Sequence, residues 1–348
     1  MNKKFLKSLL PLPSAGWKIL ISLVFLFSLL GINRLFNYSA RIETNDDLYQ
    51  KYFNDNYKIF AVNIPADLNF AGEPVPLQDF EVRERIDREF LVNTYWQSST
   101  LLLAKRANRW FPVITPILKR NGIPEDFKYL AVVESGFLHG VSSRGAAGYW
   151  QFIPGTAEAY GLRVDDAIDE RYHVEKSTEA ACKFFKEAYK NLQNWTLVAA
   201  AYNMGLTGVQ RQLTRQQVNS YYDLLLNDET ARYVFRVLAM KEILSNPRQY
   251  GFVFRKKDLY PPIPVKKVEV DTSIKNLPAY AEQLGLNYKL LKYFNPWIRT
   301  DELILKAGEK FTLSIPAESV KDYNLLMRMA DAEMPSSGIP YTEGDSLR

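Results

Sequence analysis

The sequence has very little of the chemistry that disulfides and metal centres require. It contains one cysteine, Cys182, and two histidines, His139 and His173, among 348 residues. A single thiol cannot form an intramolecular disulfide, and these three side chains are too few for the usual Cys/His zinc sites. We therefore expect no disulfide framework and no bound metal, and we interpret both histidines and the cysteine as structural or incidental.

The net charge is also small. Lysine and arginine number 44 against 39 aspartates and glutamates, which gives a formal net charge of +5. The basic residues form no stripe, so the electrostatic footprint of a nucleic-acid-binding protein is missing. Hydrophobic residues make up 47% of the chain, which is enough to bury a core. A chain of this length is long for one ordinary domain, so we expect two folded units with appendages.

The N-terminus has the pattern of a membrane-directed segment. Four lysines lie within the first 18 residues, and residues 19–32 carry no charge. This run is shorter than the ~20 residues of a bilayer span, although neighbouring apolar residues can extend it. No good small-x-small cleavage site follows, so we predict an uncleaved signal anchor over residues 1–36, with a cleaved signal peptide or a core helix as alternatives. The flanking charges place the N-terminus inside and the remaining chain outside the cytoplasm.

The rest of the chain divides by composition. Residues 37–80 are interrupted by prolines and show no sustained period, so we interpret them as a stalk. Helical signals dominate residues 81–258, where for example residues 83–109 contain few helix breakers, and they predict an α-helical domain. A proline-rich linker leads to a small unit over residues 265–316, and residues 317–348 are expected to form one helix and a frayed tail. The predicted fold class is mainly α.

One carboxylate lies at an unusual position of a predicted helix. Phe127, Leu130 and Ala131 have the spacing of an apolar helix face, and Glu134 falls on the same face. Gly136 ends the helix, so Glu134 lies in the last turn, where desolvation and the helix dipole disfavour its charged form. A raised pKa is what a general acid for glycosidic cleavage needs. The alternative is an exposed glutamate or one paired with arginine.

A glycine-rich turn with aromatic residues follows at positions 142–157. Tyr149, Trp150 and Phe152 could offer flat faces to pyranose rings, and Gln151 could offer fixed hydrogen bonds. This combination suits a sugar-binding cleft. The alternative is a tight turn whose aromatic side chains belong to the core. A phosphate-binding loop is disfavoured because no Gly-Lys-Ser/Thr follows.

Four blocks in this order resemble a known enzyme family. The blocks are Glu134-Ser-Gly-Phe, Gly145-Ala-Ala-Gly-Tyr-Trp-Gln-Phe-Ile-Pro-Gly-Thr-Ala, Ala200-Ala-Tyr-Asn-Met-Gly and Glu229-Thr-Ala-Arg-Tyr-Val. Together they are similar to the family 1 lytic transglycosylases, in particular to the membrane-bound lytic murein transglycosylase D branch. The resemblance implies a lysozyme-like helical domain that acts on peptidoglycan in the periplasm, anchored in the inner membrane by a single pass, or secreted if the anchor is cleaved.

The resemblance also implies roles for individual residues. It makes Glu134 the single catalytic acid and base, and it implies no cofactor. It places four side chains around the muramic residue of the substrate: Ser142, Gln151, Tyr202 and Asn203. Glu229 and Tyr233 match a later block that lines the same groove. Met204 stands where alanine is usual, which affects the expected subsite preference more than the expected activity. The partners implied are glycan strands and the membrane, with protein partners left open.

The expected mechanism follows from a shortage of carboxylates. Ordinary glycosidases use two carboxylates, whereas here only Glu134 lies on a helix face beside the predicted sugar-binding turn. The C6 hydroxyl of muramic acid could act as the nucleophile instead, which would give a 1,6-anhydro product. Asp165, Asp166 and Asp169 could supply a second carboxylate and make the protein a hydrolytic muramidase, but we interpret them as a solvated face. An inactive peptidoglycan-binding scaffold is the third hypothesis.

The small unit after the linker has its own pattern. We predict a strand over residues 265–270, helices over 277–284 and 288–294, and a strand over 310–315. Residues spread through this βααβ unit, from Thr272 to Pro316, resemble a divergent LysM module, a peptidoglycan-binding repeat. Such a module could tether the enzyme to its substrate. The alternative is that it only packs on the helical domain.

Overall fold

The residues that the computed structural model describes are 22–30, 32, 45–56, 60–317, 322–333 and 336–342. Residues 22–30 are helical and exposed, and helix α2 (Asn45–Asn56) has no buried side chain. Within the described part of the chain, no helix combines the length and the apolar character that a bilayer span needs. Most of the predicted anchor over residues 1–36 lies outside the described residues. Residues 60–344 form one compact unit, and the remainder of this section concerns that unit.

The segment directly before the helical domain belongs to its core. β1 (Asn69–Phe70) and β2 (Glu73–Pro74) form a short antiparallel hairpin. Phe70 is fully buried, and its ring lies 5.1 Å from the ring of Phe127. The prediction of a stalk over residues 37–80 is therefore wrong for its second half. The apolar side chains of this half pack on residues far along the chain, which a local pattern cannot reveal.

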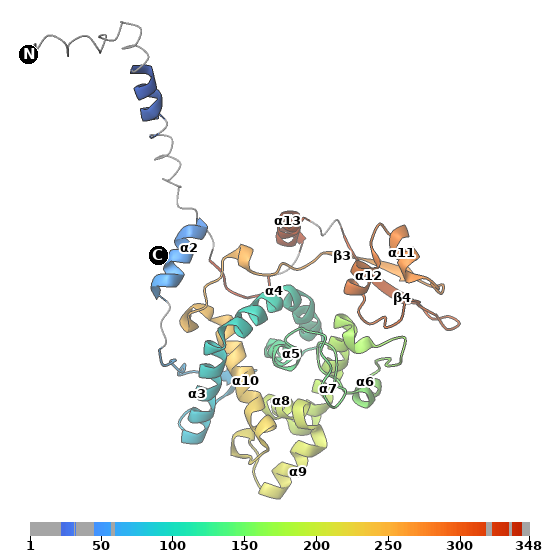
Figure 1. The fold of residues 1–348 in the computed structure, drawn as a ribbon. Coiled ribbons are helices and arrows are strands. Elements are labelled where there is room, and N and C mark those ends of the chain that lie inside the picture. The colour runs from blue at the N-terminus through green and yellow to red at the C-terminus, as the bar shows by residue number, and fades with distance from the viewer. Residues whose placement is uncertain are drawn as a thin grey trace, which may run out of the picture. The chain divides into compact units, whose positions relative to one another are not determined.

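The mainly helical fold predicted from the sequence is confirmed (Figure 1). Side-chain oxygens of Asp79, Asn194 and Asn227 accept hydrogen bonds from the first turns of three helices and so fix where these begin. The α-helices are α3 (Phe80–Tyr95), α4 (Gln97–Arg120), α5 (Lys128–Ser135), α6 (Pro154–Ala159), α7 (Val174–Leu192), α8 (Trp195–Met204), α9 (Leu206–Gln216) and α10 (Asp228–Ser245). Short 3₁₀ helices are η1 (Glu125–Phe127), η2 (Glu170–Tyr172), η3 (Tyr221–Asp223), η4 (Pro247–Tyr250) and η5 (Lys256–Asp258).

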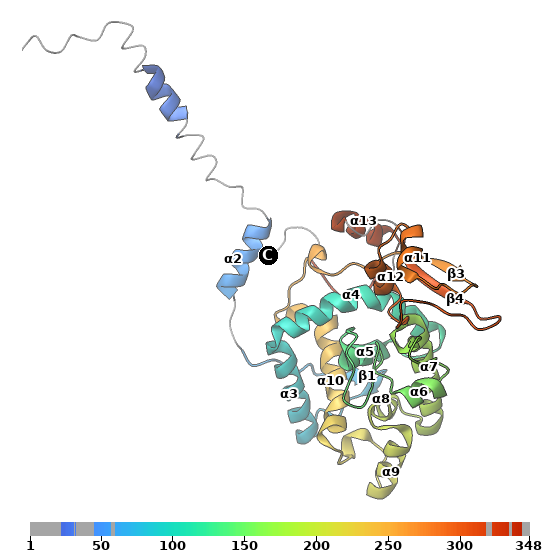
Figure 2. The same ribbon diagram turned by 45° about the vertical axis from the view of Figure 1, so that its right-hand side comes forward.

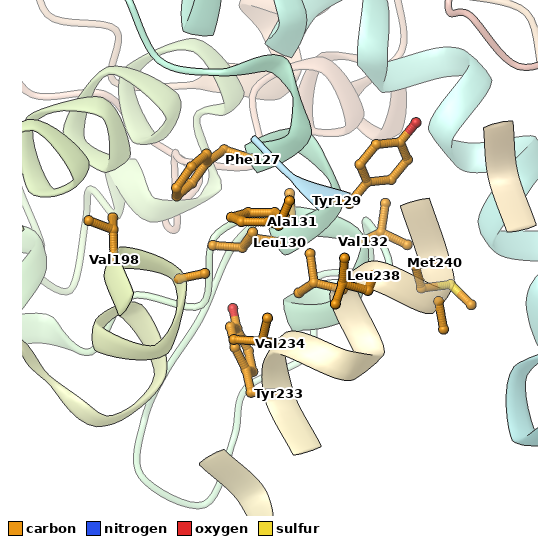
Figure 3. Packing of buried hydrophobic residues seen from close by; sticks show 14 of the residues in the cluster. Phe127, Tyr129, Leu130, Ala131, Val132, Val198, Tyr233, Val234, Leu238 and Met240 are labelled. Carbon is orange, nitrogen blue, oxygen red and sulfur yellow. The ribbon is translucent and has the colours of Figure 1, made fainter. Parts of the chain in front are cut away.

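Helix α5 lies in the middle of this domain. It packs against α4 and α10, and the two ribbon views show it enclosed by longer helices (Figures 1 and 2). Leu130 and Ala131 have no exposed surface, as their predicted helix face requires. Figure 3 shows side chains of α5 beside Val234 and Leu238 of α10 in the common core. A polar side chain on this face of α5 therefore lies beside an apolar core.

The small C-terminal module has the βααβ order that the sequence predicts. β3 (Val265–Val270) and β4 (Phe311–Pro316) pair antiparallel over their whole length, with residue 265 opposite residue 316. Helices α11 (Leu277–Gln283) and α12 (Tyr288–Phe294) connect them. The buried residues of the module form a second hydrophobic cluster, distinct from the main core, to which a few residues of the helical domain also belong.

The chain returns to the helical domain after this module. Helix α13 (Tyr323–Glu333) agrees with the helix predicted there. In the segment 336–342, Ile339 is buried in the main core, and Thr342 N donates a hydrogen bond of 2.8 Å to Phe254 O. The predicted frayed tail is therefore wrong for this segment, because an isoleucine within it has a place in the core.

Candidate active site

Glu134 lies in the last turn of α5, as the sequence predicts. The helix ends at Gly136, whose φ of 55° is left-handed, a common way for a helix to stop. A Cβ atom on Gly136 would lie 2.9 Å from Cδ2 of Leu103 on α4, so glycine also permits a close approach of the two helices. Arg106 of α4 donates a hydrogen bond of 3.0 Å to Gly136 O. Contacts with α4 thus fix the end of the helix that carries Glu134.

The carboxyl of Glu134 has an environment that favours its protonated form. Burial raises the pKa of Glu134 from 4.5 to about 7. Two nearby groups oppose this rise in pKa, namely the Tyr233 hydroxyl, which donates a hydrogen bond of 2.6 Å to Oε1, and the positive charge of Arg236. The negative charge of Glu229 adds to the rise. Burial is the largest of these effects, so Glu134 exchanges a proton near neutral pH.

One face of α10 supplies all three of these neighbours. Glu229, Tyr233 and Arg236 are spaced at i, i+4 and i+7, so they follow one another along a single side of the helix. Tyr233 is buried, whereas Glu229 in the first turn is exposed. Arg236 was not predicted as a site residue. Its position three residues after Tyr233 is the signal that could have identified it.

The turn after α5 presents Ser142 and Gln151. Ser142 Oγ accepts hydrogen bonds from the backbone of Arg144 and Ala146, which makes it part of the turn itself. The side-chain amide of Gln151 donates to Gly148 O at 3.0 Å and to Gly140 O at 3.2 Å, so this nitrogen ties together two parts of the loop.

The three aromatic residues of this turn are buried. Trp150 has no exposed surface, and its Nε1 donates a hydrogen bond of 2.9 Å to Thr178 Oγ1. Tyr149 and Phe152 are 2% and 3% exposed. The prediction that these rings form the walls of a sugar cleft is therefore wrong. The alternative is correct, because all three rings belong to the hydrophobic core. The indole nitrogen finds its partner on α7, which the local sequence could not indicate.

Tyr202 and Asn203 join the same region from the end of α8. The Tyr202 hydroxyl donates a hydrogen bond of 2.6 Å to Trp150 O, which links α8 to the turn. Asn203 Oδ1 accepts a hydrogen bond of 2.7 Å from Thr230 Oγ1, and its amide lies 3.4 Å from a carboxylate oxygen of Glu229. Hydrogen bonds thus connect the third of the four sequence blocks to the second and the fourth.

Comparisons with known proteins agree with this arrangement. Residues 112–224 match the family model described as the transglycosylase SLT domain. Residues 266–319 match the model described as the soluble lytic transglycosylase C-terminal LysM-like domain. The chain carries an SLT transglycosylase domain. A LysM-like domain follows it.

The membrane-bound lytic murein transglycosylase D of Escherichia coli, from strain K12 and from O6:H1 strain CFT073, is similar to the chain over 243 residues. The identity is 29%, and the match covers 67% of this chain and 52% of each relative. The chain thus spans about half the length of the curated relatives that it matches. The SLT model includes Glu134, the turn and the end of α8, whereas α10 lies beyond its last matched residue.

Two of the three aspartates that could have supplied a second carboxylate to the SLT domain have other partners, and the third, Asp166, is exposed. Asp169 is buried, and its two carboxylate oxygens accept hydrogen bonds of 2.9 and 2.7 Å from the guanidinium of Arg171. The interpretation of these aspartates as a solvated face is therefore wrong for Asp169. Asp165 is exposed and pairs with Arg163 at 2.6 Å.

The two histidines and the cysteine lie in different surroundings, and of the three only His139 is exposed. His139 lies on the loop after α5 with its ring 5.3 Å from that of Tyr149, and burial lowers its pKa. His173 precedes α7, and its Nδ1 lies 3.1 Å from a carboxylate oxygen of Glu175. Cys182 is fully buried. Among the residues that the structure describes, no group of three or more His, Cys, Asp or Glu side chains could hold a metal ion.

Proposed function

We propose that the protein is a lytic transglycosylase that cleaves the β-1,4 bond between N-acetylmuramic acid and N-acetylglucosamine in peptidoglycan. The observation that carries this proposal is the carboxyl of Glu134, whose pKa burial raises to about 7 within a domain that matches the SLT model. A carboxyl that is about half protonated at neutral pH can act as the general acid for glycosidic cleavage. The similar proteins of E. coli carry the name of this activity.

Glu134 alone can perform both proton transfers of the reaction. It first donates its proton to the oxygen of the scissile bond, and the bond between that oxygen and C1 of the muramic residue breaks. The Glu134 carboxylate then removes the proton of the C6 hydroxyl, whose oxygen bonds to C1. The products are a 1,6-anhydromuramic end and a free 4-hydroxyl on N-acetylglucosamine. No water is consumed, and Glu134 is protonated again.

The neighbours of Glu134 suit these two steps. The Tyr233 hydroxyl donates to Oε1, which stabilises the carboxylate between the steps and leaves Oε2 to face the sugar. An internal nucleophile gains its rate from correct placement, so the residues around the sugar matter as much as the acid. From the family resemblance we assign Ser142, Gln151 and Tyr202 to this placement, together with Asn203, and Glu229 to the wall of the groove. Because the Gln151 amide nitrogen already donates within the loop, Gln151 would present its carbonyl oxygen.

Two parts of the proposal concern where the enzyme acts. The relatives are named as membrane-bound, and the sequence of residues 1–36 has the pattern of a signal anchor. We infer a single-pass anchor in the inner membrane, with the folded unit in the periplasm. We also infer that the LysM-like module contacts glycan strands. Fractionation of cells that express the full chain would test the anchor, because a soluble periplasmic pool would indicate cleavage.

The mass of the sugars released from purified peptidoglycan tests the proposed reaction. Transglycosylation gives anhydro products that are one water lighter than those of a hydrolytic muramidase. A muramidase needs a second carboxylate, for which the exposed Glu229 is the candidate because its charge acts on Glu134. We expect anhydro products from the wild type, none from Glu134→Gln, and wild-type yield from Glu158→Gln, an exposed glutamate on α6. Reducing ends would refute the transglycosylase, and no release by the wild type would favour a binding scaffold.

A further inference from the structure

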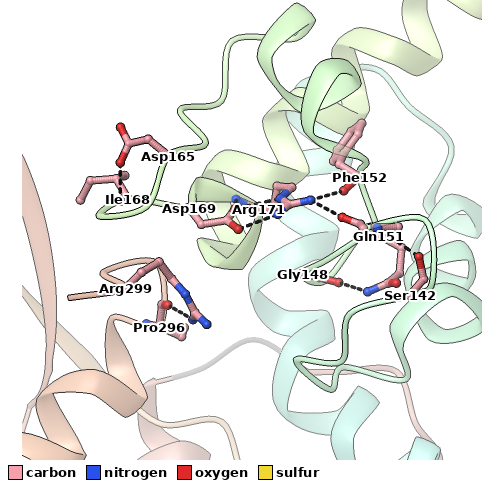
Figure 4. Close-up of polar contacts among 12 residues, drawn as sticks. Ser142, Gly148, Gln151, Phe152, Asp165, Ile168, Asp169, Arg171, Pro296 and Arg299 are labelled. Carbon is pink, nitrogen blue, oxygen red and sulfur yellow. Dashed lines mark hydrogen bonds and ion pairs between the residues drawn. The ribbon is translucent and has the colours of Figure 1, made fainter.

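Backbone hydrogen bonds join the LysM-like module to the helical domain. Asp169 N donates to Trp297 O and Arg299 N donates to Ala167 O, both at 2.8 Å. These two bonds flank Ile168, which forms an isolated antiparallel bridge with the module. Such bonds depend on the alignment of two backbones, so they hold the module in one orientation on the loop before η2. Figure 4 shows the module's Pro296 and Arg299 facing this loop.

The module and the helical domain also share a hydrophobic core. Ala147, Ile168 and Tyr172 come from the helical domain, yet all three are buried in the cluster of the module. The guanidinium of Arg299 lies 4.5 Å from the centre of the Tyr172 ring, which is cation–π distance. Ala147 is notable because it belongs to the turn that follows α5. The turn and the module therefore contribute to one hydrophobic cluster.

A buried ion pair continues from this contact into the turn. Asp169, whose backbone bonds to the module, holds the guanidinium of Arg171 through both of its carboxylate oxygens. The Nη1 of Arg171 donates to Gly145 O at 2.6 Å and to Phe152 O at 2.9 Å. Arg171 thus joins two separate points of the turn, and Figure 4 shows its contact with Phe152. Only the planar fork of an arginine can make this set of bonds at once.

The turn needs such support because its backbone conformation is energetically unfavourable without it. Gln151 has a φ of 49°. This left-handed conformation is energetically unfavourable for any residue other than glycine, so it persists only where neighbouring groups enforce it. At Gly148 a Cβ atom would lie 1.9 Å from Arg171 O, so the turn is pressed against the backbone of Arg171. The conformation that presents Gln151 is therefore imposed by its surroundings.

We propose that the LysM-like module positions the Gln151 turn, through Asp169 and Arg171, and so acts as a fixed brace of the active site. Its consequence for catalysis rests on the proposed function, while the physical coupling does not. Asp169 and Arg171 are positioning residues, since they act through Gln151. A mobile tether would behave differently, because its orientation relative to the active site would not affect the turn.

Hydrogen exchange in the full chain tests the coupling without any substrate. Ile168→Ala removes three carbons at the contact with the module and leaves Asp169 and Arg171 in place. We expect the amides of Ala147 and Gln151, which are hydrogen-bonded within the turn, to exchange about tenfold faster in this variant. Ile243→Ala is the matched control, because Ile243 is equally buried but belongs to the main core. It should leave the exchange of both amides within about twofold of the wild type.

Activity on purified peptidoglycan provides the second measurement. If the module is a brace, Ile168→Ala lowers kcat about tenfold with little change in KM or in sedimentation with peptidoglycan. Arg171→Lys keeps the charge but not the fork, and it should produce the same changes in exchange and kcat. Unchanged exchange of the turn in Ile168→Ala would refute the brace. An absence of turnover by the wild type would refute the proposed function instead, and the exchange result would still decide on the brace.

Discussion

Glu134→Gln is expected to stabilise the fold by an amount that grows with pH. Burial raises the pKa of Glu134 from 4.5 to about 7. Between these values the unfolded chain releases the proton while the folded chain retains it, so the wild type loses stability as the pH rises. Glutamine does not titrate in this pH range, and it keeps the oxygen that accepts the hydrogen bond from Tyr233. The variant should therefore escape this loss.

The size of the effect follows from the two pKa values of Glu134. One pKa unit corresponds to 1.36 kcal/mol, so the wild type carries a penalty of about 3 kcal/mol once the pH exceeds 7. At pH 5 the penalty is only about 0.8 kcal/mol, because this pH lies only half a unit above the unfolded pKa of 4.5. The advantage of the variant should thus grow by about 2.5 kcal/mol between pH 5 and pH 8, which corresponds to roughly 5–10 °C in Tm for a domain of this size.

Thermal unfolding followed by circular dichroism at pH 5, 6, 7 and 8 and constant ionic strength provides the assay. The quantity that matters is the difference in Tm between variant and wild type, since other titrating groups cancel in it. Glu158→Gln serves as the control for the exchange of a glutamate for a glutamine, because Glu158 is exposed on α6. An equal difference at pH 5 and pH 8 for Glu134→Gln would mean that Glu134 ionises alike in both states. The proposed acid would then lack its physical basis.

Two further substitutions test the site. Tyr233→Phe removes the hydrogen bond that opposes the raised pKa of Glu134. The alkaline limb of the pH–rate profile should therefore move up by about one pH unit, and the rate should fall about tenfold. An unmoved limb would contradict the role of Tyr233. Gly148→Ala forces a Cβ atom into Arg171 O and should cost more than about 3 kcal/mol in urea unfolding. A Cβ atom on Gly155 in α6 would have no atom within 4 Å, so Gly155→Ala should be neutral or stabilise the fold by about 0.5–1 kcal/mol. Equal effects of Gly148→Ala and Gly155→Ala would be evidence against the close contact between Gly148 and Arg171.

Local periodicity was sufficient to predict the elements whose patterns are complete within a few residues. Glu134 falls on the apolar face of a short helix ended by Gly136, and both features depend on neighbours within two turns. The strands and helices of the C-terminal module were predicted for the same reason, with bounds within a residue of those observed.

The errors in the prediction concern contacts between distant parts of the chain. Trp150 looked available for a sugar because its partner Thr178 lies on another helix. Phe70 looked like part of a stalk because the ring that it packs on belongs to η1. Asp169 looked solvated because the burial of its ion pair with Arg171 depends on how the loop folds over the turn. Composition and period carry no information about such pairings.

The return of the chain onto the helical domain after the LysM-like module has a practical consequence. Ile339 fills part of the main core, and the Thr342 backbone forms a hydrogen bond with that of Phe254. The segment that follows the module therefore completes the helical domain that precedes the module. Cutting the gene after residue 264 would remove both and damage the enzyme for reasons unrelated to glycan recognition. An internal excision of residues 265–317, closed by a short glycine-serine bridge, is the deletion that separates the two roles.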